Sequence, residues 1–211
     1  MTLALLSYPE SKRGKETIKA ALTDCDQSNP QVGYIASEPD IDRRYFRQTQ
    51  QVYEEFGASL SVYLELEDAF DEAAFEQLLT LNAIHLSGGN TYRFLCALKQ
   101  RNLMPALIDY VEQGGILIGV SAGAMIMTPS IVTASLCGDV NHVGLQELSG
   151  LGLTPFTFVP HSEKLGKDII AAREMVNSEG VKCYLCSNDE GILLRKGQAR
   201  WQLFGEPVLV I

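Results

Sequence analysis

The sequence predicts an α/β fold in which helices flank both faces of a mainly parallel sheet, with extra strands towards the C-terminus. Strand and helix patterns alternate through the first 120 residues, which is typical of a parallel sheet. Residues 116–120 form a continuous apolar run, as expected for a parallel strand buried on both faces. Beyond residue 130 strand patterns dominate. The length of 211 residues suits one domain over residues 1–211.

The strands of the first part of the chain are short apolar runs between turn residues. We expect them at residues 3–7, 31–37, 59–66, 83–86 and 116–120. The segments between them place apolar residues at helical spacing, and acidic residues at 71 and 72 favour a helix start there. We expect these helices at residues 15–25, 40–56, 71–81, 90–100 and 105–113.

The last third of the chain has a different pattern. It predicts strands at residues 131–135, 156–160, 182–187, 191–195, 199–204 and 207–211, with one helix over 165–177. Residues 195–199, Arg-Lys-Gly-Gln-Ala, read as the turn of a hairpin. The strand at 207–211 either pairs with a second copy or lies inside the sheet, so the sequence leaves the oligomeric state open.

Composition and charge narrow the function classes. Hydrophobic residues make up 46% and charged residues 20%, which is ordinary for a globular protein. A net charge of −9 disfavours nucleic acid and anionic membrane as partners. No apolar run is long enough for a membrane span, and no basic segment precedes the short apolar N-terminus, so we predict neither a span nor a secretion signal.

The five cysteines are scattered along the chain and predict reduced thiols in a cytoplasmic protein. Cys183 and Cys186 have C-x-x-C spacing, but they lie in a strand pattern with neither a second cysteine pair nor a nearby histidine. A zinc site needs about four ligands, so we interpret both as structural thiols and predict no metal or cofactor.

Residues 119–123, Gly-Val-Ser-Ala-Gly, match the G-x-S-x-G pattern of a nucleophile elbow, a sharp strand-to-helix turn that exposes a serine hydroxyl. The apolar strand before Ser121 and the apolar helix pattern after it are the context that this turn requires. Ser121 is therefore a candidate nucleophile, and the N–H of Ala122 is a candidate donor to an oxyanion. The alternative is that Ser121 only caps a helix rich in Gly and Ala.

A second turn, Ser87-Gly88-Gly89-Asn90, also joins a strand to a helix. Ligand sites of open α/β sheets lie at the carboxyl ends of strands, so this turn is expected near the serine. Adjacent glycines let the backbone approach a ligand, and their N–H groups can supply the second oxyanion donor. Asn90 either caps the helix or hydrogen-bonds substrate.

A serine nucleophile needs a base, and the chain has three histidines. His161 ends a predicted strand and is the preferred base. His85 lies inside a strand and is interpreted as a buried histidine, whereas His142 lies in a polar segment that we expect to be exposed. A carboxylate should orient the base. The residues alone do not choose among the candidates, which are Glu190, Asp139, Glu147 and Asp189.

Taken together, these motifs resemble the peptidase E family of serine peptidases, which are α-aspartyl dipeptidases related to cyanophycinases. The matching segments are Gly-Gly-Asn-Thr at 88–91, Gly-Val-Ser-Ala-Gly-Ala at 119–124, Pro-His at 160–161 and Asp-Glu-Gly at 189–191. The resemblance covers essentially the whole chain in order and spacing. It implies a fold similar to class I glutamine amidotransferases, and hydrolysis of small peptides through an acyl-enzyme without metal or cofactor.

The resemblance also implies roles for individual residues. Ser121 would be the nucleophile, His161 the general base and acid, and Glu190 the residue that orients His161. Asp139, in the segment after the elbow, remains the alternative acid. The implied oxyanion donors are Gly89 and Ala122. At the implied substrate site, Gly88 would shape the turn and Asn90 would contact the substrate.

Two features depart from the family pattern. Ser87 stands where dipeptidase members have a first glycine, and the segment after His161 lacks the Thr-Arg-Glu stretch whose Arg meets the substrate carboxylate. Lys and Arg are not equivalent as carboxylate ligands, so the Asp preference stays open. The basic residues that can replace the missing Arg are Lys164, Lys167, Arg173 and Arg93.

Other functions are compatible with parts of this pattern. Another serine-dependent amidase or esterase shares G-x-S-x-G, but α/β-hydrolases order their triad Ser, acid, His, whereas the order here is Ser121, His161, Glu190. A non-catalytic member with a vestigial site would be indifferent to Ser121→Ala. A glutamine amidotransferase is disfavoured because Ser121 stands where that class needs Cys. The partner that the resemblance implies is a small peptide.

Overall fold

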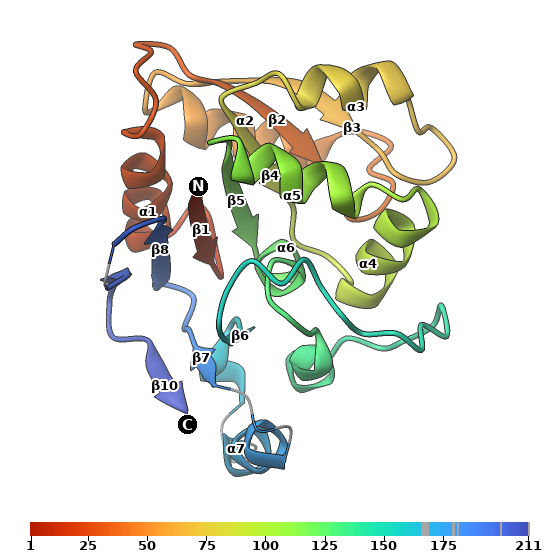
Figure 1. Ribbon diagram of the computed structural model, residues 1–211, viewed down its shortest axis with the longest axis vertical. Helices are drawn as coiled ribbons and strands as arrows, with labels where there is room; N and C mark the ends of the chain where they lie inside the picture. The colour runs from red at the N-terminus through yellow and green to blue at the C-terminus, as the bar shows by residue number, and fades with distance from the viewer. Residues whose placement is uncertain (166–168, 179, 181, 199, 211) are drawn as a thin grey trace.

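The computed structural model describes residues 1–165, 169–178, 180, 182–198 and 200–210 (Figure 1). In this part of the chain, seven strands form a sheet in the order β3-β2-β4-β5-β1-β8-β9. Neighbouring strands run parallel from β3 to β1, while β8 is antiparallel to both β1 and β9. The strands are β1 (Thr2–Leu6), β2 (Gln31–Ile35), β3 (Ser59–Leu64), β4 (Ala83–Leu86), β5 (Ile116–Val120), β8 (Gly191–Arg195) and β9 (Gln202–Phe204).

Helices cover both faces of this sheet, as predicted. Side chains of β1 alternate between the two layers: Leu3 and Leu5 pack with one set of helices, and Ala4 and Leu6 pack with the other. The first set is α3 (Glu72–Leu78), α4 (Thr91–Gln100) and α5 (Met104–Glu112), and the second is α1 (Lys12–Leu22) and α2 (Arg44–Glu54) (Figure 1). Residues on both faces of the central strands are therefore buried, which explains their continuous apolar sequences.

The C-terminal part forms a second, three-stranded sheet in the order β10-β7-β6. Its strands are β6 (Thr157–Val159), β7 (Cys183–Leu185) and β10 (Val208–Val210), and α7 (Ile169–Ser178) lies beside it. Figure 1 shows this unit beyond the carboxyl ends of β1 and β5. The loops that follow β6 and β7 are thereby brought to the end of β5, where α6 (Ala122–Ile126) begins.

Several predicted boundaries differ from the structure. The helix expected at 15–25 is α1 at Lys12–Leu22, because the side chain of Ser11 caps its start. Two further differences also have a clear cause. The expected strand at 131–135 is instead a 3₁₀ helix, η1 (Val132–Cys137). Its start is fixed by a single bridge between Ser130 and Ser149, and the hydroxyl of Thr133 donates to the carbonyl of Phe158 at 3.2 Å. The expected helix at 40–56 begins only at Arg44, because the side chain of Asp40 accepts the N–H groups of residues 44 and 45.

Burial explains the cysteine pattern at the second sheet. Cys183 and Cys186 are buried as free thiols, and burial raises the pKa of Cys183 to about 11. Protonated thiols of this kind behave as small apolar side chains. None of the helices in the described residues combines the length and the hydropathy that crossing a bilayer requires.

Candidate active site

Ser121 lies at a sharp turn between β5 and α6. Its backbone adopts φ 49° and ψ −109°, a conformation that strains any residue with a side chain. Its N–H donates to the carbonyl of Leu6 at 2.9 Å. A Cβ on Gly119 would lie 2.6 Å from the backbone nitrogen of Ala124, and one on Gly123 only 2.2 Å from the carbonyl oxygen of Leu86. The small residues around Ser121 are therefore required by close backbone contacts, as the sequence predicted.

His161 contacts Ser121 directly. The Oγ of Ser121 lies 3.1 Å from Nε2 of the imidazole, across 40 residues of sequence. His161 follows β6 in the left-handed conformation, with φ 54°, and its N–H donates to the hydroxyl of Ser7 at 3.3 Å. Two of the four described non-glycine residues with positive φ are thus this serine and this histidine. Strain held at two touching polar residues is typical of a functional site.

The other imidazole nitrogen meets an amide. Nδ1 of His161 lies 2.5 Å from Oδ1 of Asn188, in the loop after β7. An amide oxygen can only accept, so Nδ1 carries the proton and Nε2 is free to accept from the hydroxyl of Ser121. The N–H of Asn188 donates to the carboxylate of Glu163 at 3.1 Å, which ties the two loops together.

The expected contact between Glu190 and His161 is not formed. Among the described residues, Asn188 takes that place, two positions earlier in the same loop. The carboxylate of Glu190 instead accepts the N–H of Ser187 at 2.6 Å and the N–H of Glu206 at 3.0 Å. One of its oxygens therefore holds the loop that carries Asn188, and the other holds the segment that follows β9.

The other three candidate carboxylates are also engaged elsewhere. Asp139 accepts the N–H of Thr91 at 2.9 Å, at the start of α4. Asp189 accepts the N–H of Arg13 at 2.8 Å. Glu147 forms an ion pair with Lys99. In the described part of the chain, the third member of the Ser-His arrangement is therefore an amide.

Asn188 is not among the residues predicted from the sequence, because a carboxylate is the expected partner of a catalytic histidine. A signal was nevertheless present, since Asn188 is next to Asp189 and Glu190 at a predicted strand end. Cysteine proteases with a Cys-His-Asn arrangement show that an amide can orient a catalytic histidine. The choice between Asn188 and Glu190 depends on the path of the loop, which the residue types do not specify.

The Gly88–Gly89 turn lies beside the serine. A Cβ on Gly88 would be 3.5 Å from Cβ of Ser121. Gly89 has φ 139°, and a Cβ there would lie 2.1 Å from the hydroxyl oxygen of Ser37. That hydroxyl donates to the carbonyl of Gly88 at 2.6 Å, which holds the turn in place. Among the described residues, the N–H groups of Gly89 and Ala122 have no hydrogen-bond acceptor.

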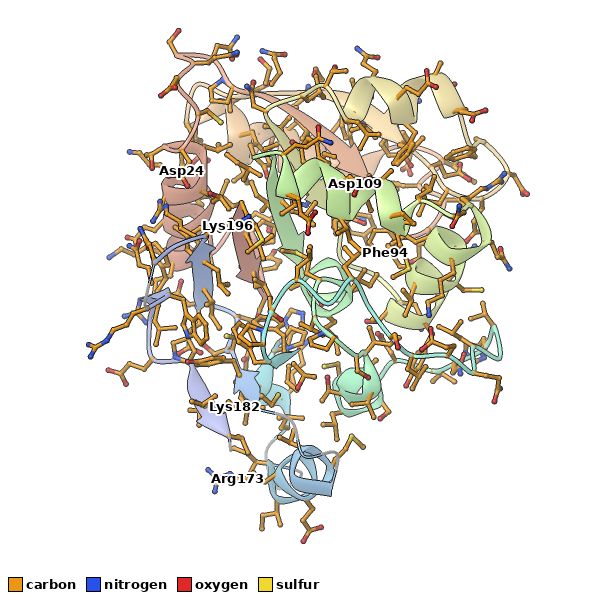
Figure 2. The ribbon with its side chains drawn as sticks, in the orientation of Figure 1. Asp24, Phe94, Asp109, Arg173, Lys182 and Lys196 are labelled. Atoms are coloured by element: carbon orange, nitrogen blue, oxygen red, sulfur yellow. The ribbon has the colours of Figure 1, made fainter. Side chains whose placement is uncertain are left out.

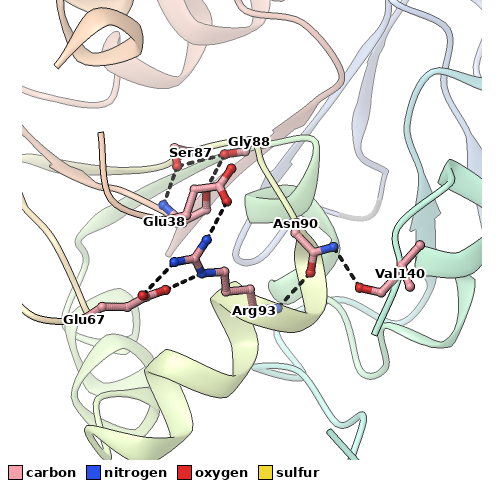
Figure 3. Close-up of polar contacts among 8 residues, drawn as sticks. Glu38, Glu67, Ser87, Gly88, Asn90, Arg93 and Val140 are labelled. Atoms are coloured by element: carbon pink, nitrogen blue, oxygen red, sulfur yellow. Dashed lines mark hydrogen bonds and ion pairs between the residues drawn. The ribbon is translucent and has the colours of Figure 1, made fainter. Parts of the chain in front are cut away.

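Asn90 acts as a helix cap in this structure. Its Oδ1 accepts the N–H of Arg93 at 3.0 Å, and its Nδ2 donates to the carbonyl of Val140 at 3.0 Å (Figure 3). Together with the bond from Thr91 to Asp139, this joins the start of α4 to the segment after η1. One hydrogen on Nδ2 remains for a substrate contact.

His85 belongs to the core, as interpreted from the sequence. It is 1% exposed, stacks on Tyr34, and its Nδ1 lies 3.0 Å from the hydroxyl of Tyr53. Burial lowers its pKa from 6.5 to about 3. His142, in contrast, is exposed.

The buried His85 predicts a pH dependence of stability. Its pKa is lower in the folded than in the unfolded chain, so its contribution is complete above pH 6.5 and is lost as the pH falls from 6.5 towards 3. Between pH 7.5 and pH 5, protonation of His85 in the unfolded chain should lower the free energy of unfolding by about 2 kcal/mol. Urea unfolding of the wild type and of His85→Gln at both pH values checks this. An equal pH dependence in the two proteins would contradict it.

The basic residues named from the sequence are not grouped at the serine. Arg93 lies on α4, one turn from Asn90, and forms ion pairs with Glu38 and Glu67. Lys164 and Arg173 are exposed, and Arg173 lies on α7 at the end of the molecule remote from the main sheet (Figure 2). Lys167 lies outside the described residues.

Comparison with known proteins agrees with the motifs and their geometry. The family model for peptidase family S51 matches residues 3–202, nearly the whole chain. The chain belongs to peptidase family S51. This S51 chain is 34% identical to peptidase E of Salmonella arizonae over 89 residues, and 36% identical to peptidase E of Escherichia coli (strain K12 / DH10B) over 76 residues.

These alignments cover 42% and 36% of the S51 chain, and 38% and 32% of the two relatives. The chain thus spans about a third of the length of the curated relatives that it matches.

Two solved structures have the same fold as this S51 chain. One is a Listeria monocytogenes EGD-e protein provisionally assigned as a peptidase E, with a TM-score of 0.74 and 22% identity over 95% of this chain and 97% of that one. The other is a peptidase from an acI-B1 actinobacterium, with the same score and identity over 97% and 87%. Both likenesses confirm the predicted mainly parallel sheet flanked by helices.

Proposed function

We propose that this chain is a serine-type peptidase that hydrolyses small peptides through an acyl-enzyme. The observation that carries the proposal is the contact of 3.1 Å between Oγ of Ser121 and Nε2 of His161, at a strained strand-to-helix turn. Membership of family S51 supports the same chemistry. The contact to Asn188 holds the imidazole in the tautomer that can accept the serine proton.

The reaction follows from these positions. Oγ of Ser121 attacks the peptide carbonyl carbon, and its proton passes to Nε2 of His161. The resulting oxyanion accepts from the N–H groups of Ala122 and Gly89, each worth roughly 10²- to 10³-fold in kcat. His161 then gives the proton to the leaving amine, and the C–N bond breaks. Water repeats the sequence on the acyl-enzyme and releases the acid and free Ser121.

The remaining residues of the predicted site have supporting roles in this proposal. Gly88 lets the turn lie against Ser121, and Asn90 offers its second Nδ2 hydrogen to the substrate. Glu190 acts through the loop, because it holds the backbone on both sides of its own position. Ser121 and His161 are half-buried, which favours short peptides over folded proteins as substrates.

Turnover of dipeptides tests the proposal. Purified protein incubated with a set of unblocked dipeptides should release free amino acids, detected by amine labelling and chromatography. Ester substrates of similar size should be cleaved as well, since the same nucleophile attacks both carbonyls. Hydrolysis of esters without hydrolysis of any peptide would favour the alternative serine esterase.

Variants at Asn188 separate its role from that of Glu190. Asn188→Ala should lower kcat by roughly 10- to 100-fold with little change in KM, because the imidazole loses its orientation but the nucleophile and the oxyanion donors remain. Asn188→Asp should keep activity, since a carboxylate accepts the same N–H. The comparison variant is Glu190→Gln. A larger loss of kcat in Glu190→Gln than in Asn188→Ala would show that Glu190 is the functional partner.

A further inference from the structure

An ion-pair cluster lies along the Gly88–Gly89 turn. The guanidinium of Arg93 binds the carboxylate of Glu67 through two hydrogen bonds, of 2.5 and 2.7 Å, and binds Glu38 through a third of 3.1 Å (Figure 3). The three side chains come from different elements: Arg93 from α4, Glu67 from the loop after β3, and Glu38 from the loop after β2. They remain accessible, with side chains that are 39%, 28% and 45% exposed, in the same order.

The cluster is close to the nucleophile through the glycine turn. Glu38 follows Ser37, whose hydroxyl holds the carbonyl of Gly88. A Cβ on Gly89 would lie 3.5 Å from Oε1 of Glu38. Gly88, in turn, borders Ser121. The Glu38 carboxylate therefore lies beside the glycine turn that would hold the substrate carbonyl.

The net charge of this cluster determines which substrate groups it attracts. Two carboxylates and one guanidinium leave a net charge of −1. Glu67 occupies the planar fork of Arg93, the geometry in which Arg binds a carboxylate best. Oε1 of Glu38 has no hydrogen-bond partner among the described residues. A carboxylate oxygen with a free acceptor site thus lies close to Gly89, and the guanidinium of Arg93 already pairs with both carboxylates.

Given the proposed peptidase function, we propose that Glu38 is a specificity-determining residue that disfavours acidic substrates. Peptides with a neutral or cationic residue before the scissile bond are preferred over those with Asp. The cation that Glu38 attracts is either the free α-ammonium group of the substrate or a basic side chain. Glu38 also pairs with Nη1 of Arg93, so an Asp side chain could approach this guanidinium only beside a carboxylate of like charge.

Neutralising Glu38 should therefore change substrate preference. In Glu38→Gln the cluster has no net charge, and Nη1 of Arg93 is released from its ion pair. A substrate carboxylate then meets a partly free guanidinium in place of a like charge. We expect the ratio of kcat/KM for Asp-Leu to that for Asn-Leu to rise roughly tenfold, the size expected of one unit charge at short range in a partly exposed site.

The test measures kcat/KM for Asp-Leu, Asn-Leu, Lys-Leu and norleucyl-Leu, with N-acetylated forms to remove the α-ammonium group. The proteins are wild type, Glu38→Gln, Glu38→Gln/Arg93→Met and the control Glu55→Gln. Glu55, the residue that caps the C-terminus of α2, pairs with Lys15 of α1 at 2.7 Å, so the control removes an equal charge and an ion pair elsewhere.

We expect the wild type and Glu55→Gln to favour Asn-Leu over Asp-Leu by tenfold or more. The double variant should lose the gain seen in Glu38→Gln. A loss of rate on acetylation assigns the α-ammonium as the attracted cation, and a preference for Lys over norleucine assigns the side chain.

Two results would overturn the inference while leaving the peptidase function intact. One is a wild type that prefers Asp-Leu, and the other is an Asp-to-Asn ratio in Glu38→Gln that equals the ratio in Glu55→Gln. If no dipeptide is cleaved and Ser121 does not react with a fluorophosphonate, the proposed function fails and the inference fails with it. Labelled Ser121 with unchanged ratios overturns the role of Glu38 alone.

Discussion

Ser121→Gly is expected to abolish peptide hydrolysis and yet give a more stable protein than Ser121→Ala. Both variants lack the nucleophile, so kcat should fall by roughly 10⁴-fold or more in each. The backbone of residue 121, with φ 49° and ψ −109°, is strained for alanine as it is for serine, but it is accessible to glycine. Glycine should therefore exceed alanine in the free energy of unfolding by about 1–2 kcal/mol.

This order reverses the usual ranking, in which glycine is less stable than alanine. Urea unfolding of both variants at pH 7.5, with dipeptide turnover on the same samples, measures the two effects together. The loss of the hydroxyl contact to His161 is common to both variants and cancels in the comparison. An alanine variant as stable as the glycine variant would show that the turn is not strained at Ser121.

Gly123→Ala should have the largest effect on folding. A Cβ at this position would lie 2.2 Å from the carbonyl oxygen of Leu86 and 2.7 Å from its carbonyl carbon. These are backbone atoms of β4, so no side-chain rotation relieves the clash. The N–H of Gly123 also donates to the carbonyl of Ser87 at 3.0 Å, so α6 would have to move away from β4 and break this bond.

We expect Gly123→Ala to lose about 3 kcal/mol or more in the free energy of unfolding. The part that still folds should lose more than about 100-fold in kcat, because the N–H of Ala122 moves with α6. Gly138→Ala is the matched control. Gly138 has φ 86° and nothing within 4 Å of an added Cβ, so only conformational strain of about 1 kcal/mol applies. Equal losses in the two variants would contradict the steric explanation.

The elbow and the parallel sheet could be predicted because each rests on local sequence. The continuous apolar run of β5 indicates a strand that is buried on both faces. The glycines at 119 and 123 indicate that the backbone is closely packed on either side of Ser121. The strand expected at 131–135 was wrong for the opposite reason. Its β-branched residues fit a strand locally, but Thr133 bonds to the distant Phe158 and the chain curls into η1.

The orientation of His161 could not be predicted, because it depends on several loops meeting in space. Glu190 carries the carboxylate expected of the partner of His161. That carboxylate instead accepts hydrogen bonds from the backbone N–H groups of residues 187 and 206. Asn188 reaches the imidazole only because Glu163 and Glu190 fix the loop around it. The pairing of Arg93 with Glu38 and Glu67 likewise joins α4 to two separate loops, and so the availability of that arginine could not be judged from composition.

The central claim is that Ser121 is a nucleophile activated by His161. Reaction of the folded protein with a fluorophosphonate, followed by mass spectrometry of its peptides, tests this most directly. The predicted result is a single adduct on Ser121 that forms in the wild type, is absent in Ser121→Ala and is at least 100-fold slower in His161→Ala. An unlabelled Ser121 in folded wild-type protein that also cleaves no dipeptide, or labelling at an equal rate without His161, would contradict the claim.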